Sequence, residues 1–222
     1  EMLFEATPHT SGPDRKKLLE RKLEQHFRQS KLTRYKIQGR EADGRRDDSV
    51  IFCSLGGCED LDAIIELLFE LETPVAGIYS APTLCKSYLE PLLDKPSVLV
   101  MSEIDNGISE RVAVRQSFFK NGELKLTRVG TIDVASEETL HADVENELES
   151  SRRYLTREHL IAAEEKLDVI FVSSTKYLAA LSHYTEEMAQ HFVFNHISTY
   201  ELATLIGMDS NNKDLAFEEI IA

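Results

Sequence analysis

The feature that most constrains the fold of this chain is a turn-rich block that begins at Ser97. Three segments with alternating or continuous apolar residues, SVLVMSEI, ERVAVRQSFF and ELKLTRVGTI, are separated by Asp105-Asn106-Gly107 and by Lys120-Asn121-Gly122. Asn-Gly is the strongest short-range hairpin signal, because both residues accept a positive φ. The block therefore predicts three consecutive antiparallel strands.

The connections change after this meander. A helix is predicted from Ser136, with Glu137 and Glu138 favourably placed near its N-terminus. It is followed by a buried strand at 167–173, a helix at 176–190, a strand at HFVFNHI, and a helix from Thr199 to Ile206 that ends at Gly207. Strands joined through helices run parallel. Residues 97–207 thus have the order β-β-β-α-β-α-β-α, which is that of an RNase H-like domain.

The first half shows a different pattern. Residues 1–13 carry Pro8, Gly12 and Pro13 and are predicted to be irregular, and Asp14 is the expected N-cap of an amphipathic helix. Strands are predicted at 32–38, 50–54 and 75–79, with helices from Asp60 and after Ser80. Strands and helices that alternate with short links indicate parallel strands and a doubly wound sheet.

These patterns predict two domains in an α/β protein. Residues 1–95 are assigned to a partial first RNase H-like domain without its opening meander. Residues 96–222 are assigned to a second RNase H-like domain, whose mixed sheet joins a three-stranded antiparallel meander to parallel strands. Two such domains in tandem are characteristic of the actin-like ATPase superfamily.

Charge limits the class of partner. The net charge of -14 disfavours binding to nucleic acid or to an anionic membrane surface, since both attract Lys and Arg. Residues 1–48, in contrast, carry 12 basic against 9 acidic residues. This basic region is either a solvated helix face or a surface that docks on an acidic partner.

Cysteine use and hydropathy indicate a cytoplasmic protein. Cys53, Cys58 and Cys85 suit reduced thiols better than a disulfide framework or a zinc set. The N-terminus lacks the order of a signal peptide, and no apolar run reaches the 18 to 20 residues of a membrane span. Any membrane contact is expected through partners or through a segment outside this chain.

Four phrases of the chain resemble the cytoplasmic actin-like domains of bacterial type IV pilus assembly and type II secretion proteins, including those of the mannose-sensitive pilus type. They are the helix DRKKLLERKLEQHF leading to the strand with Tyr35, the phrase ETPVAGIYSAPTL, the hairpin FFKNGELKLTR, and the stretch ENELESSRRYL. The resemblance implies a scaffold at the inner membrane that engages the assembly ATPase or neighbouring membrane subunits. Whether the chain forms a homodimer is left open.

The resemblance also implies where a nucleotide would bind. In the superfamily, glycine-containing hairpin turns place backbone N–H groups against the phosphates, and here that turn is Asp105-Asn106-Gly107, with Asp105 placed to position Mg²⁺ or a water. Three observations oppose ATP binding. Glu110 and Arg111 replace the expected hydroxyl-rich continuation, no glycine follows Ser173, and the first-domain meander is not in this chain.

Other site patterns are weaker. Residues 209–220 lack the central glycine and the terminal glutamate of a calcium loop, and His183, His191 and His196 are interpreted as structural histidines. The sequence therefore predicts a non-catalytic scaffold without a cofactor. The alternatives are an ATP-binding actin-like protein that uses Asp105 and Gly107, and an α/β interaction module unrelated to secretion.

Overall fold

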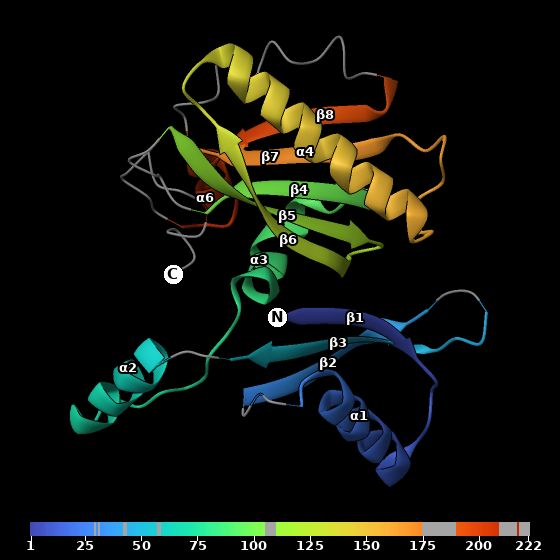
Figure 1. The fold of residues 1–222 in the computed structure, drawn as a ribbon, viewed down its shortest axis with the longest axis vertical. Helices are drawn as coiled ribbons and strands as arrows, with labels where there is room; N and C mark the ends of the chain where they lie inside the picture. The colour runs from blue at the N-terminus through green and yellow to red at the C-terminus, as the bar shows by residue number, and fades with distance from the viewer. Residues whose placement is uncertain are drawn as a thin grey trace. The chain divides into compact units, whose positions relative to one another are not determined.

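The computed structural model describes residues 1–28, 30, 32–41, 44–56, 59–104, 110–174, 190–208 and 217. The chain divides into two compact units, Glu1–Ile78 and Tyr79–Ala222. Each unit is built around a β-sheet of its own (Figure 1). The division lies nearer the N-terminus than the predicted boundary at residue 95, so the helix after Ser80 belongs with the second unit.

The first unit is a three-stranded antiparallel sheet covered by a helix. Its elements are β1 (Met2–Thr7), α1 (Gly12–His26), β2 (Leu32–Arg40), β3 (Asp48–Leu55) and α2 (Glu59–Glu70). The strand order is β1-β3-β2, and both neighbouring pairs are antiparallel. Leu19, Leu23 and Phe27 of the α1 region pack on Val50 and Phe52 of β3. The apolar residues that predicted an amphipathic helix therefore form the core of this unit.

A buried carboxylate holds one end of the first sheet. Asp48, at the start of β3, is almost completely buried and accepts a hydrogen bond from His9 at 2.9 Å. Arg15 of α1 forms a salt bridge with the other carboxylate oxygen at 2.9 Å, and Arg40 of β2 lies 3.8 Å away. A buried charge is tolerated where it is paired in this way, and the cluster ties α1, β2 and β3 together.

Two predictions for this half of the chain are wrong. Residues 2–7, expected to be irregular, form the strand β1, which pairs with β3 from Met2↔Cys53 to Thr7↔Asp48. The strands β2 and β3, whose mutual pairing was not predicted, form an antiparallel hairpin. The physical reason is the link between them, because the short loop with positive φ at Gly44 and Arg46 reverses the chain without a crossover helix. The segment 75–79, expected as a buried strand, is exposed and has no strand assignment.

The second unit contains a mixed five-stranded sheet. Its elements are α3 (Ala81–Leu89), the 3₁₀ turn η1 (Glu90–Leu92), β4 (Ser97–Glu103), β5 (Arg111–Lys120), β6 (Glu123–Asp133), α4 (Glu137–Arg157), β7 (Leu167–Ser173), β8 (Phe192–Ser198) and α6 (Thr199–Leu205). The strand order is β6-β5-β4-β7-β8. β4, β5 and β6 pair antiparallel, whereas β7 pairs parallel to both β4 and β8.

This unit confirms the predicted RNase H-like order for its described elements. Asn121 and Gly122, with φ of 51° and 74°, form the tight turn between β5 and β6. α4 crosses one face of the sheet (Figure 1), and its apolar residues Leu140, Val144 and Leu148 join the main core of the unit. The helix predicted at 176–190 lies outside the described residues, apart from its last residue.

Candidate functional site

Polar side chains gather where the parallel strands of the second sheet end. Glu103 ends β4, Ser173 ends β7 and is followed by Ser174, and Ser198 ends β8. All four residues are buried. The parallel pairings Ser102↔Val172 and Ser173↔Ser198 bring these ends to the same edge of the sheet. In open α/β sheets, ligands bind outside the carboxyl ends of the strands, so this edge is the candidate site.

Glu103 connects the ends of β4 and β7. Its Oε2 accepts a hydrogen bond from the backbone N–H of Ser174 at 2.8 Å, and the two residues are 1% and 2% exposed. Burying a carboxylate costs free energy unless hydrogen bonds compensate it. The bond therefore fixes Glu103 beside β7 and occupies the backbone amide that directly follows this strand.

Ser173 and His196 form the next contact along the edge. The Oγ of Ser173 lies 2.9 Å from Nε2 of His196 and donates to the carbonyl of Ser174 at 3.2 Å, and the imidazole stacks on Phe171 with ring centroids 6.1 Å apart. Burial lowers the pKa of His196 below its ordinary value of 6.5, against an opposing effect of the nearby Glu201 carboxylate. Because Ser173 is completely buried, a substrate could not reach its hydroxyl, and the Ser–His pair acts as a structural contact.

Glu201 and Ser198 close the edge as the capping box of α6. Ser198 donates to Oε2 of Glu201 from its backbone N–H at 2.9 Å and from its hydroxyl at 2.8 Å, and its hydroxyl accepts from the N–H of Glu201 at 3.1 Å. These hydrogen bonds from Ser198 lower the pKa of Glu201. The N-terminal amide of α6 is therefore satisfied internally.

An open pocket of about 560 Å³ lies beside this edge, between η1, β8 and α6. Asp94, Asn195, His196 and Glu201 supply its polar lining, together with apolar residues such as Leu92 and Leu205. Among the described residues, no Lys or Arg lines this pocket. Two carboxylates without a cation do not suit a phosphate group, which is bound by basic side chains or free backbone N–H groups.

The predicted site residues Asp105, Asn106 and Gly107 lie outside the described residues. The flanking strands are placed, since Ile104 donates its backbone N–H to Ala113 at 3.0 Å and so extends the hairpin of β4 and β5 towards the turn. Nucleotide binding at this turn stays a prediction. The sequence drew attention to the position of Ser174 only through its lack of glycine, and Glu103 was not predicted, although an acidic residue at the end of the apolar strand SVLVMSE was a usable signal.

The cysteines, the histidines and the calcium-like loop were the other candidate sites of the sequence. Cys53 and Cys85 are free thiols, and burial raises the pKa of Cys53; Cys58, His183 and the supposed calcium loop, except for Phe217, lie outside the described residues. Within the described ranges, no group of three or more His, Cys, Asp or Glu side chains could hold a metal ion.

No helix in the described part of the chain combines the length and apolar character needed to cross a membrane.

Comparison with known proteins gives a structural likeness but no sequence relative. No protein-family model matches the chain, and no curated protein matches it in sequence. A chain of a PilM–PilN type IV pilus biogenesis complex is similar in structure, with a TM-score of 0.54 and 11% identity, over 90% of this chain and 67% of that one. A Bacteroides thetaiotaomicron protein of unknown function with an actin-like ATPase fold matches with a TM-score of 0.41 and 12% identity, over 94% of this chain and 70% of that one. At these identities the likeness concerns the fold alone, and the predicted α/β fold class, with a mixed sheet in the second unit, is confirmed.

Proposed function

We propose that this chain is a non-catalytic scaffold of a pilus-biogenesis or type II secretion apparatus, which binds protein partners on the cytoplasmic side of the inner membrane. The observation that carries the non-catalytic part is the hydrogen bond between Glu103 and Ser174 at the end of β7. An actin-like ATPase needs open backbone there for its nucleotide. In this chain a buried carboxylate and a buried serine occupy that position.

Steric occupancy supports the proposal. The Glu103 carboxyl group is almost completely buried and is bonded to the backbone N–H that follows β7, so this amide is not open to a phosphate. The serine that follows β7 also adds a side chain where glycine would leave room for a nucleotide. Both features disfavour ATP at this edge and leave protein binding as the better-supported role.

The fold supports the context of the proposal. The similar chain belongs to a complex between two pilus-biogenesis proteins, and a domain of this kind functions there as part of an assembly. By analogy, the assembly ATPase and the inner-membrane subunits of the same apparatus are the partners to test.

Partner binding can be measured directly. The purified chain is mixed with the cognate assembly ATPase and with each neighbouring inner-membrane subunit, and complex formation is followed by interferometry. We expect saturable binding to at least one of them. Absence of binding to every one of these proteins would remove the scaffold proposal.

Nucleotide binding is tested separately, by calorimetry with Mg-ATP on the same preparation. We expect no binding heat at millimolar nucleotide, since no Lys or Arg of the described part of the chain lines the pocket at the carboxyl edge. The matched variant is Gly107→Val, which would block a phosphate at the predicted turn. Heat that appears with the natural chain and disappears in this variant would show that the ATP-binding alternative is correct.

A further inference from the structure

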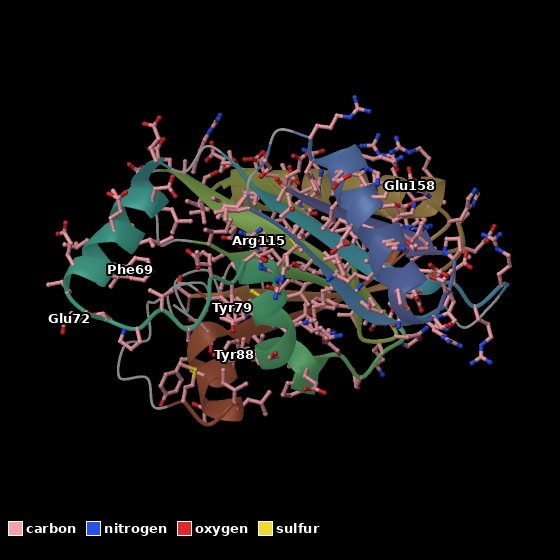
Figure 2. The ribbon with its side chains drawn as sticks, turned by 90° about the horizontal axis from the view of Figure 1, so that it is seen from below. Phe69, Glu72, Tyr79, Tyr88, Arg115 and Glu158 are labelled. Atoms are coloured by element: carbon pink, nitrogen blue, oxygen red, sulfur yellow. The ribbon has the colours of Figure 1, made fainter. Side chains whose placement is uncertain are left out.

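The helix α2 has an apolar surface without a partner among the described residues. None of its residues is buried, and Ile64, Leu67 and Phe69 are 54%, 53% and 69% exposed. Leu71, just after the helix, is 65% exposed and continues the face of Ile64 and Leu67, because residues at i, i+3 and i+7 lie on one side of a helix. Figure 2 shows Phe69 on α2 and Glu72 just beyond the end of the helix. Exposed contiguous apolar surface of this kind marks an interaction site.

The chain that follows α2 has the character of an unpaired strand. Residues 75–78 are apolar at every position, so both faces of an extended strand formed by them would be apolar. All four residues are exposed. Among the described residues, their backbone groups form no backbone hydrogen bond. Such a segment can add to the free edge of a sheet, where main-chain hydrogen bonds provide the affinity.

Charge indicates what kind of edge this segment would join. Residues 59–79, which we call the acidic segment, contain six Asp and Glu and no Lys, Arg or His. In the first unit, β2 pairs only with β3 among the described strands, so its other edge is free. β2 presents Arg34 and Lys36 as exposed side chains that form no salt bridge with a described residue, and Leu32 at its start is 48% exposed.

We propose that copies of this chain associate by docking the acidic segment of one copy on β2 of the next. Residues 75–78 add a strand to the free edge of β2, and the acidic residues Glu66 and Glu70 of α2 pair with Arg34 and Lys36 of the neighbouring copy. The 21 residues of the acidic segment fall within the ~20 to 30 residues per side of a standard interface. Two acidic segments would repel each other, so the contact joins two different surfaces and builds a ring or a filament.

The association is tested by sedimentation velocity on the full 222-residue chain over a concentration series. We expect mass to increase with concentration and to decrease at high salt. Three variants should each weaken association about tenfold or more. Ala76→Pro removes a main-chain donor, Glu66→Lys with Glu70→Lys reverses the acidic surface, and Arg34→Glu with Lys36→Glu reverses β2.

Two controls make the result specific. Val129→Asp alters an equally exposed apolar residue on the edge strand β6 of the second unit and should leave association unchanged. A mixture of the two charge-reversed variants should associate, because the basic α2 of one meets the acidic β2 of the other, and the unchanged α2 of the second meets the unchanged β2 of the first. Circular dichroism of each variant confirms that it is folded.

Several results would overturn the proposal. The first two are a monomer at every concentration and association that Ala76→Pro leaves unchanged. The others are a Val129→Asp variant whose association is weakened as much as that of the three test variants, and a mixture of the charge-reversed variants that stays monomeric.

Discussion

Gly130 on β6 lies directly against the carboxylate of Glu147 on α4. A Cβ at this position would be 2.7 Å from Oε2 of Glu147. That carboxylate cannot move freely, because it accepts hydrogen bonds from Gln116 of β5 and Arg128 of β6. Gln116 is completely buried and would lose its acceptor if Glu147 shifted. The absence of a side chain at residue 130 therefore allows a polar network between the sheet and α4.

We expect Gly130→Ala to lower the free energy of unfolding by about 1 to 2 kcal/mol, the cost of leaving a buried polar group unsatisfied. Urea unfolding followed by circular dichroism measures this change; the chain has no tryptophan for fluorescence. In a Glu147→Ala background, Gly130→Ala should lower the free energy of unfolding by clearly less, since the Glu147 carboxylate that its Cβ would meet is absent. Equal costs in both backgrounds would show that the contact with Glu147 does not matter.

Asp48 is the second residue whose replacement should be costly. Asp48→Asn removes the charge that binds His9 and Arg15, and we expect a loss of about 2 kcal/mol, as for hydrogen bonds to charged groups. The neighbouring Asp47, whose side chain is 18% exposed, pairs with Arg45, whose side chain is 78% exposed. Asp47→Asn is therefore the matched control and should change stability by less than about 0.5 kcal/mol. Similar losses in the two variants would contradict the assigned role of Asp48.

At the scale of elements, the start of α4 is fixed by a capping box. The Oγ of Ser136 accepts from the N–H of Thr139 at 3.2 Å, and Oγ1 of Thr139 accepts from the N–H of Ser136 at 3.1 Å. We expect Ser136→Ala to destabilise the chain by about 1 kcal/mol. Ser150→Ala, in the middle of the same helix, should be neutral or slightly stabilising. Thermal unfolding of the two variants separates loss of the cap from loss of any serine.

The elements differ in how far the sequence could predict them. The meander from Ser97 and the start of α4 at Ser136 are local features, since they depend on Asn121-Gly122 and on a cap that neighbouring residues supply. The strand β1 was missed because its only strand partner in the described sheet, β3, is more than 40 residues away and its own segment is short. The segment 75–79 was wrongly expected as a buried strand, since its composition suits a strand but the structure provides no partner for it. Composition indicates what a segment can pair with, and only the fold decides whether the partner is present.

At the scale of the whole molecule, stability should fall in two steps on acidification. Burial lowers the pKa of His196, so protonation favours the unfolded chain as pH falls below about 6.5. Burial raises the pKa of Glu5, but hydrogen bonds from Lys22 and His26 outweigh it and leave that pKa below its ordinary 4.5. The stabilisation by Glu5 is therefore complete above pH 4.5 and is lost as pH falls through its lower folded pKa.

Urea midpoints measured from neutral to acidic pH check this prediction. His196→Gln keeps a hydrogen-bonding partner for Ser173 but does not titrate, so the first decrease should become smaller. Glu5→Gln should make only the second decrease in stability, at the more acidic pH, smaller. A pH profile that neither variant changes would show that other groups control the acid stability.

The parallel pairing of β4 with β7 has a consequence for the synthesis of the chain. Val98 pairs with Asp168, so β4 has no partner on that side until about 70 more residues have been made. Until then the apolar strand SVLVMSE presents an open edge that can pair with another nascent chain. The first sheet, in contrast, is complete once Leu55 has emerged, because all of its strands lie before that residue. The first unit can therefore fold early on the ribosome, while the second remains vulnerable to aggregation until its later strands arrive.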